Sequence, residues 1–303
     1  MGKLFQKCMF YVKILPYLSH SIPITMSYAT ELFGKENVME KKLPGVYPAT
    51  KKDGTTYYRS SITFQRKHIS LGSYDSASMA CGAYLEATEL LKDSALSLHD
   101  YSSLRILPFE KWVTLINFRD NHLYFATPIY LYKKYFEYFL SPKESLKFDL
   151  DDLFYYSTRK IMKRGRHFFV ADYGMQVNIA NRYGIKNYAV HGRDFRFVNG
   201  DNLDFRYENI EIMNIYHGVS RQENKKGIFY VAKIHLNGNY TIGKYATETE
   251  AAIAYNKAID IVKKAGVTKN FVPNYLEGLS PSSYADIYSK LPVSDKILNY
   301  RLE

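Results

Sequence analysis

The stretch GVSRQENKKGIFYVAKIHLNGNYTIGKYATETEAAIAYNKAIDIVKK, Gly218 to Lys264, decides the fold because a strand pattern and a helix pattern follow each other in it. Apolar and polar residues alternate from 230 to 236, the period of a strand with one buried face. Asn237-Gly238 then favours a tight hairpin turn into a further strand at 239–242. Thr247 and Glu250 fit a capping box, and apolar residues recur at helical spacing beyond it. The stretch predicts a three-stranded antiparallel sheet backed by one helix.

The same plan occurs earlier, in Gly45 to Lys92, GVYPATKKDGTTYYRSSITFQRKHISLGSYDSASMACGAYLEATELLK. Both copies open with Gly-Val, pass through an LGSY or IGKY step and close in an alanine-rich segment. The turn of the earlier copy near Gln65-Arg66-Lys67 lacks glycine, and its helix is expected to start at Asp75 or Ser76. We interpret the two stretches as one supersecondary unit used twice.

Each predicted sheet has one face covered by its helix and one bare face. In the second copy, the residues expected on the bare face or in its first hairpin are Ser220, Arg221, Lys225, Lys226, Val231, Lys233, His235, Asn239 and Thr241. In the first copy, the residues expected to contact DNA are Arg59, Ser61, Thr63, His68 and Ser70. A narrow basic and polar sheet fits a DNA major groove, where such side chains reach phosphates and base edges. An ordinary solvated sheet face is the alternative.

Composition favours an anionic partner. The 303 residues include 41 Lys and Arg against 30 Asp and Glu, a net charge of +11. Such an excess is typical of proteins that bind nucleic acid or an acidic membrane surface, although a basic protein without a polyanion partner remains possible. Cys8 and Cys81 are the two cysteines, so we expect no disulfide framework, no zinc site and a reducing compartment. No run is long and apolar enough for a membrane span, and no cofactor is expected.

The second copy resembles the Apetala-two/ethylene-response-factor DNA-binding domain, whose hallmarks are Y-R-G-V-R, A-x-I, L-G-T-F and an A-A-x-A-Y helix. The matching residues are YHGVSR, AKI, IGKY and AAIAY, and the resemblance covers most of residues 215–275. It implies contacts to double-stranded DNA from His217, Ser220, Lys233, His235, Asn239 and Thr241. The hallmark arginines are replaced by His217 and Ser220, and the sheet-face tryptophans are absent, so we expect phosphate contacts with modest base readout.

The first copy resembles the same domain more weakly, through GVYPAT, SSI, LGSY and ACGAY. It is also similar to the arm-type DNA-binding domain of phage integrases.

The segment His167–Asn214 resembles the HNH endonuclease module of phage and mobile-element proteins, in which an Apetala-type domain follows directly. The stretch RFVNGDNLDFRYENIEIMN, Arg196 to Asn214, carries the matching residues. In register with the signature H-H-I-N-G-D-x-x-x-N-R-x-E-N-L are Val198, Asn199, Gly200, Asp201, Arg206, Glu208, Asn209 and Ile210.

The chemistry of an HNH site needs histidines that this stretch lacks. One histidine activates the attacking water, and further side chains hold a divalent metal. Arg196 and Phe197 occupy the positions of the paired histidines, and neither a guanidinium nor a phenyl ring can act as the base. His191 is a possible displaced base if the hairpin brings it opposite Asp201 or Asp204. Without that rescue, Arg193, Arg196 and Arg206 are predicted to form a phosphate clamp that does not cut, with pairing of Arg206 and Asp204 as the simpler alternative.

The middle of the chain carries two further patterns. An aromatic stripe, which we interpret as a packing element at helical spacing, consists of Tyr132, Tyr135, Phe136 and Phe139. A basic cluster, which suits phosphates or a basic linker, consists of Arg159, Lys160, Lys163, Arg164 and Arg166.

The predicted fold is α+β: two sheet-plus-helix modules flank a degenerate ββα (HNH-like) module and a helical, aromatic connector. In order, we expect a tail (1–40), the first module (41–92), the connector (93–156), the HNH-like module (157–214), the second module (215–275) and a C-terminal tail (276–303). The predicted function is double-stranded DNA binding, as a transcriptional regulator or mobile-element accessory factor, with no catalytic or metal-binding residues and with an HNH-type homing endonuclease as the alternative. The predicted location is the cytoplasm, at the nucleoid, or the nucleus of a eukaryote, and the oligomeric state is left open.

Overall fold

The computed structural model describes residues 43–301, so the predicted tail at 1–40 and Cys8 lie outside the described residues. The chain forms two compact units. The first contains the described residues up to Leu146 together with Leu150–Thr158, and the second contains Lys147–Asp149 and the chain from Arg159 onward. Helices and several three-stranded antiparallel sheets confirm an α+β fold.

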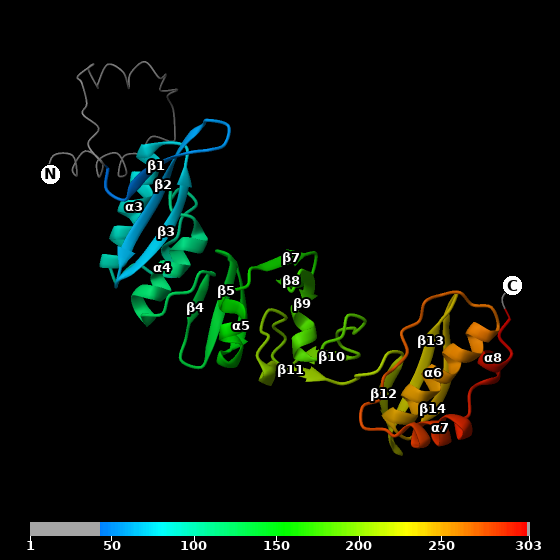
Figure 1. The fold of residues 1–303 in the computed structure, drawn as a ribbon. Helices are drawn as coiled ribbons and strands as arrows, with labels where there is room; N and C mark the ends of the chain where they lie inside the picture. The colour runs from blue at the N-terminus through cyan, green and yellow to red at the C-terminus, as the bar shows by residue number, and fades with distance from the viewer. Residues whose placement is uncertain (1–42, 302–303) are drawn as a thin grey trace, which may run out of the picture. The chain divides into compact units, whose positions relative to one another are not determined.

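The first module has the predicted plan. Strands β1 (Val46–Thr50), β2 (Thr56–Phe64) and β3 (Lys67–Tyr74) form an antiparallel sheet in that order. Helix α3 (Ala77–Lys92) follows, with the side chain of Ser76 accepting a hydrogen bond from the backbone N–H of Met79 as N-cap. Figure 1 shows α3 along one side of this sheet.

The second module repeats it. Strands β12 (Val219–Asn224), β13 (Gly227–His235) and β14 (Asn239–Tyr245) form the sheet, and helix α6 (Glu248–Lys264) packs on one side of it (Figure 1). The predicted capping box is present, because Thr247 and Glu250 each accept a hydrogen bond from the other's backbone N–H. This box satisfies two of the N–H groups that a helix start leaves unpaired.

The repeat extends to the irregularities of the sheets. The pairing of β2 with β3 shifts register between Ser60 and Ser61, and that of β13 with β14 shifts between Ala232 and Lys233. In both modules the residue after this bulge donates its backbone N–H to the opening glycine of the module, at 3.0 and 2.7 Å. Ser61 and Lys233 therefore occupy corresponding positions.

The opening glycines are required by close packing. Gly45 and Gly218 have φ of 71° and 72°, in the left-handed region. A Cβ on Gly45 would collide with the ring of Tyr84, and one on Gly218 with the ring of Tyr255. Each ring belongs to the helix of its own module, so the glycine lets the first strand lie directly against that helix.

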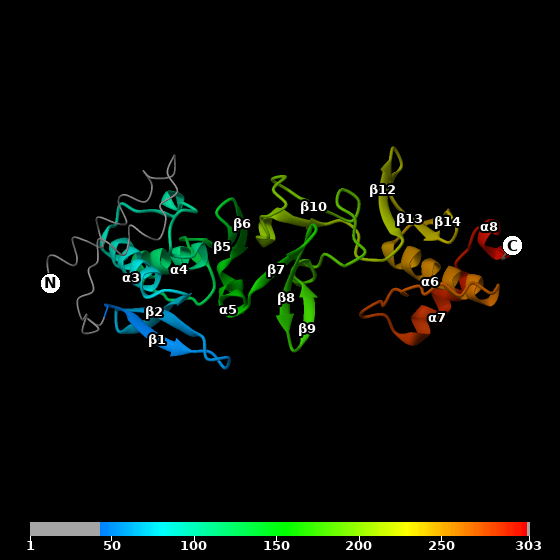
Figure 2. The same ribbon diagram turned by 90° about the horizontal axis from the view of Figure 1, so that it is seen from above.

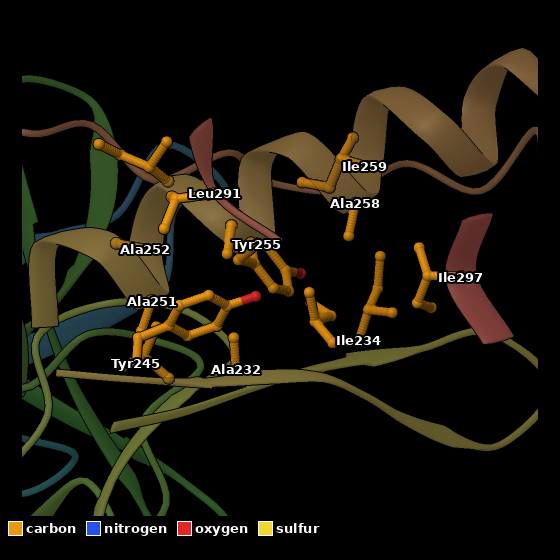
Figure 3. Close-up of a cluster of buried hydrophobic side chains, with 14 of the residues drawn as sticks. Ala232, Ile234, Tyr245, Ala251, Ala252, Tyr255, Ala258, Ile259, Leu291 and Ile297 are labelled. Atoms are coloured by element: carbon orange, nitrogen blue, oxygen red, sulfur yellow. The ribbon is translucent and has the colours of Figure 1, made fainter. Parts of the chain in front are cut away.

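Small side chains let α6 approach its sheet closely. Ala251, Ala252 and Ala258 of the helix are fully buried and share one core with Ala232 and Ile234 of β13. Figure 3 shows these side chains between the helix and the strand below it.

Both modules are larger than the sequence predicts. Trp112 and Ile116 of helix α4 (Phe109–Asn121) lie in the same core as Ile69 and Leu71 of β3, so part of the expected connector completes the first module. In the second module the expected tail 276–303 is partly core: Leu276, Leu291 and Ile297 are buried there. Helices α7 (Pro281–Lys290) and α8 (Asp295–Leu298) belong to this segment. Amphipathic segments this short give little sequence signal, and burial against α3 or α6 stabilises them.

The aromatic stripe is not helical. It lies on and beside strands β4 (Ile129–Leu131) and β5 (Tyr135–Ser141), which form a sheet with β6 (Glu144–Asp149). The short helix α5 (Leu153–Ser157) follows that sheet. Phe136 is fully buried, so the predicted packing role of that residue is confirmed while its helical spacing is wrong. In β5, Tyr135 and Phe139 share one face and Phe136 points to the other, so residues at helical spacing do not form one stripe on this sheet.

Residues 159–214 form a meander and a hairpin without an α-helix. Strands β7 (Ile161–Arg164), β8 (His167–Asp172) and β9 (Met175–Asn178) make the meander seen in Figure 2, and β10 (Phe195–Phe197) pairs with β11 (Ile210–Ile212). The expected ββα module therefore has its hairpin but lacks its helix, because the chain runs from β11 almost at once into β12.

None of the helices in residues 43–301 is long and apolar enough to cross a membrane.

Candidate nucleic-acid interface

Strand register decides which side chains of the second module point away from α6. We name this outer surface the lysine face, and it consists of Ser220, Gln222, Asn224, Phe229, Val231, Lys233, His235, Asn239, Thr241 and Lys244. Partners across the strands share a face, so the pairing of Val231 with Lys244 and of Lys233 with Thr241 places both lysines on it.

The lysine face is positively charged. It contains no Asp or Glu, and Lys233 and Lys244 are both exposed. Within residues 43–301, no carboxylate lies close enough to either ammonium group to form an ion pair. Lys244 Nζ lies 5.4 Å from the centroid of the Phe229 ring. Lysines without an ion-pair partner can neutralise phosphates without first losing another ionic contact.

Polar groups surround these cations. His235 Nδ1 and Asn239 Oδ1 lie 3.1 Å apart, and both side chains are exposed, as is that of Thr241. Lys225 and Lys226 are exposed at the turn between β12 and β13. All five residues were predicted as DNA contacts, and all five are accessible.

Three other residues expected on the bare face of the second module, Ser220, Arg221 and Val231, differ from that expectation in position or exposure. Arg221 pairs with Tyr230, so it shares the helix side of the sheet and not the lysine face. Val231 points outward but is only 3 % exposed, and the Ser220 hydroxyl donates to its carbonyl oxygen. Alternation within a strand means that adjacent Ser220 and Arg221 cannot share a face.

His217 lies behind the sheet. Its ring centroid is 4.6 Å from that of Tyr188 and 5.2 Å from that of Tyr255, whose hydroxyl lies 2.9 Å from Nδ1. Its backbone N–H donates to Asn274 Oδ1 at 2.7 Å. Burial lowers the pKa of His217 below its ordinary value of 6.5. The residue packs the first strand against α6 and does not point to a DNA groove.

The outer surface of the first module has a different composition. We name it the tyrosine face, and it consists of Tyr47, Ala49, Tyr57, Arg59, Ser61, Thr63, His68, Ser70 and Ser73. Four of the five predicted contacts are exposed, namely Arg59, Thr63, His68 and Ser70, whereas Ser61 is only 8 % exposed. A serine beside the bulge is too short to reach past its neighbours, whereas Lys233 at the corresponding position does.

In the hairpin of β10 and β11, ion pairs engage the arginines of the predicted clamp. Arg196 Nε lies 2.6 Å from Glu211 Oε2. Arg206 Nη2 lies 2.6 Å from Asp204 Oδ2, and Arg206 Nη1 is 2.9 Å from Glu208. The simpler reading, pairing of Arg206 with Asp204, is what the structure contains. These arginines are therefore less available to phosphates than the exposed lysines of the lysine face.

The matching residues of the HNH signature hold the loop between β10 and β11. Asp204 is fully buried, and its carboxylate accepts hydrogen bonds from Arg206 and from Asn199 Nδ2 at 3.0 Å. Burial alone would raise the pKa of Asp204, but these hydrogen bonds lower it below its usual value. Asn209 Nδ2 donates to the carbonyls of Asp201 and Asp204 at 3.2 and 2.8 Å. The same residue types that support a nuclease site here close a loop.

His191 packs among aromatic rings. Its ring centroid lies 6.0 Å from that of Phe197, in a stacked arrangement, and 5.5 Å from that of Phe195, in an edge-on arrangement. In residues 43–301, no three His, Cys, Asp or Glu side chains gather closely enough to hold a metal ion.

The basic cluster begins at Arg159 and Lys160, just before β7, and continues along β7 and its turn into β8. Arg164 and Arg166 are exposed on either side of Gly165, whereas Arg159 Nη2 pairs with Asp172 Oδ1 at 3.0 Å. The hairpin tip thus carries two exposed arginines, while Arg159 and Lys160 lie where the chain enters the second compact unit.

Sequence reasoning missed Lys244, Tyr47 and Tyr57, which all lie on the outer faces. Counting alternation from Lys233 alone does not place Lys244, because the bulge shifts the register between them. Tyr47 and Tyr57 alternate with buried Val46 and half-buried Tyr58, a signal that could have found them.

Comparison of the chain with protein-family models, with curated proteins and with solved structures gave no match.

Proposed function

We propose that this protein binds double-stranded DNA, with the lysine face as its main contact surface. The observation that carries the proposal is a three-stranded sheet face with two exposed, unpaired lysines and no carboxylate among its residues. A sheet of this width fits the major groove, where Lys233 and Lys244 would reach phosphates and His235, Asn239 and Thr241 would reach base edges.

The first module adds exposed cationic and polar groups to the charge that favours DNA. Arg59 and His68 are exposed on the tyrosine face, and the net charge of +11 favours a polyanion throughout the chain. Because lysine and arginine bind phosphates whatever the base sequence, the proposed protein tolerates different target sequences. The role that we propose is that of a transcriptional regulator or of an accessory factor of a mobile element.

Salt dependence tests the proposal. A fluorescently labelled duplex of random sequence is titrated with the full chain at increasing salt concentrations, and binding is followed by anisotropy. If about six phosphates are neutralised, the logarithm of the affinity falls with the logarithm of the salt concentration with a slope near −5. Binding no stronger than to controls blocked with heparin would overturn the proposal.

A protein that mimics DNA is a different partner for the same surface. Unlabelled duplex of unrelated sequence separates the two, because it competes for a DNA-binding face. Failure of that duplex to displace a bound protein partner would speak against duplex binding.

The HNH-type endonuclease with an altered site has its own test. Supercoiled plasmid is incubated with the protein and Mg²⁺ or Mn²⁺, and nicked product is measured on a gel. We expect no nicking above the background of a buffer control. Nicking that disappears in His191→Ala would instead establish the nuclease and assign its base.

A further inference from the structure

The tyrosine face differs from the lysine face at the positions nearest the opening strand. Tyr47 is 49 % exposed and Tyr57 is half-buried, and both point outward beside Arg59. The corresponding residues of the second module are Ser220 and Phe229. The second module therefore has no tyrosine at either position, and Lys244 Nζ lies 5.4 Å from the centroid of its Phe229 ring.

The two tyrosines are spaced as neighbours on one sheet surface. Tyr47 pairs directly with Arg59, and Tyr57 precedes Arg59 by two residues on the same side of β2. Diagonal neighbours of this kind have Cα atoms about 7–8 Å apart. Two tyrosine rings at that separation can each stack on a different base of one strand, provided that the two bases are not stacked on each other.

Arg59 fixes one of the rings and retains donors for a ligand. Its Nη2 and Nε donate to the Tyr57 hydroxyl at 2.8 and 3.2 Å, and its guanidinium carbon lies 5.6 Å from the Tyr57 ring centroid. An arginine has five N–H donors, so the remaining ones can bond a phosphate oxygen.

The charge of the surface suits a nucleic-acid backbone. The tyrosine face contains no Asp or Glu. Exposed cations flank it at both ends, with Lys51 and Lys52 in the turn after β1 and Arg66 in the turn after β2. Aromatic rings for bases and cations for phosphates are the two components of single-strand binding surfaces.

We propose that the tyrosine face binds single-stranded nucleic acid, with unpaired bases stacked on Tyr47 and Tyr57 and a phosphate bound by Arg59. In a duplex the faces of the bases are hidden by their neighbours, so these rings would gain little from intact double-stranded DNA. The inference goes beyond duplex binding by the lysine face and is independent of it.

Binding of short single strands tests the inference. The full chain is titrated into fluorescein-labelled oligothymidylate and oligouridylate of about 15 nucleotides, a length within the range of single-strand sites. Whichever binds more tightly identifies DNA or RNA as the ligand. We expect Tyr47→Ser to weaken that binding about tenfold, since the stacking of one base on an aromatic side chain raises the affinity by about a factor of ten.

Matched variants separate stacking from other effects. Tyr47→Phe keeps the ring and is expected to bind single strands as the wild type does. Tyr275→Ser removes a tyrosine that is 82 % exposed in the second module and is also expected to have no effect. Equal affinity of Tyr47→Ser and the wild type, or a loss in Tyr47→Phe as large as in Tyr47→Ser, would refute the inference.

Photocrosslinking locates the bound base directly. Oligonucleotides that carry 5-iodouracil are irradiated in complex with the full chain, and the modified peptide is identified by mass spectrometry. An adduct on Tyr47 or Tyr57 is the expected result, and adducts confined to the second module contradict it. If the wild type fails to bind duplex but shows Tyr47-dependent binding of single strands, the proposed duplex function fails while this inference stands.

Discussion

The two modules of this chain share a backbone plan and differ in what their outer faces present. Strand order, bulge position, opening glycine and helix cap all correspond. At three corresponding outer positions, however, the first module has Arg59, Ser61 and Ser73 where the second has Val231, Lys233 and Lys244. The shared backbone plan therefore depends on the inner residues, and the outer faces differ while that plan is kept.

The helices show the same freedom at a position that faces the following segment of the chain. Glu86 of α3 accepts hydrogen bonds from the backbone N–H groups of Ile106 and Leu107 at 3.1 and 2.8 Å. At the corresponding position of α6, Lys257 Nζ donates to the carbonyls of Tyr288 and Leu291 at 2.7 and 2.9 Å. Opposite charges thus hold the following segment against the helix, because a backbone offers both donors and acceptors.

The largest expected effect tests whether the modules are the same structural unit. Gly45→Ala and Gly218→Ala should each lower the free energy of unfolding of their own module by about 2–4 kcal/mol, because a side chain would be strained at this φ and would collide with a helix tyrosine. Hydrogen exchange of β2 and β13 amides, measured by mass spectrometry, reports each module separately.

Gly54→Ala is the control for these glycine changes. Gly54 has φ of 84°, but no atom lies within 4 Å of an added Cβ. Gly54→Ala should therefore lower the free energy of unfolding by only about 1 kcal/mol. A Gly45→Ala variant as mild as this control would break the correspondence between the modules.

The second prediction converts one outer face toward the other. Lys233→Ser combined with Lys244→Ser gives the second module the serines that the first has at these positions. Duplex affinity at about 0.1 M salt should fall at least about tenfold, and the salt slope should become shallower by about 2, since each lost phosphate contact contributes about 0.9. Anisotropy titrations at several salt concentrations give both quantities.

The converse change adds a cation to the first module. Ser73→Lys should raise duplex affinity by about threefold and steepen the salt slope by about 1. An unchanged slope in both variants would show that these faces do not meet phosphates.

The third prediction concerns the turns. The first module turns through Gln65 and Arg66 with φ of 44° and 65°, whereas no residue of 236–238 in the second module has a positive φ. Arg66→Gly should therefore stabilise the first module by about 0.5–1 kcal/mol through relief of left-handed strain. Asn237→Gly in the second module, without such strain, should give no gain. Denaturant-dependent hydrogen exchange of each sheet measures the difference.

The smallest expected effect is sensitivity to acid in the second module alone. Burial in the folded module lowers the pKa of His217 below 6.5, while the unfolded chain binds a proton near pH 6.5. Stability should therefore be constant at higher pH and fall as pH drops below about 6.5. The first module has Pro44 at this position and should lack the effect.

Exchange rates corrected for their intrinsic pH dependence provide the measurement for His217. His217→Gln should remove the loss of stability between about pH 7 and pH 5. A loss of equal size in the variant would assign the acid sensitivity to other groups.

Much of each module could be predicted from the sequence, because its signals are local. The alternation at 230–236 predicted β13, the capping box at Thr247 and Glu250 predicted the start of α6, and Ser76 was one of two expected caps for α3. Most of the outer-face residues followed from the same alternation. Single residues beside an irregularity did not, since the bulge decides whether Lys244 faces outward and leaves Ser61 buried.

By itself, the sequence determined a sheet-plus-helix unit that occurs twice, because strand and helix periods depend on neighbouring residues along the chain. Only the tertiary structure decided that α4 completes the first core, that Leu291 and Ile297 complete the second, and that Asp204 is held by Arg206 in the loop between β10 and β11. Most of these contacts join segments that lie far apart in sequence. The pair of Asp204 and Arg206 lies in a loop, where residues follow neither the helix period nor the strand period. Burial and hydrogen bonding, rather than backbone periodicity, select such contacts.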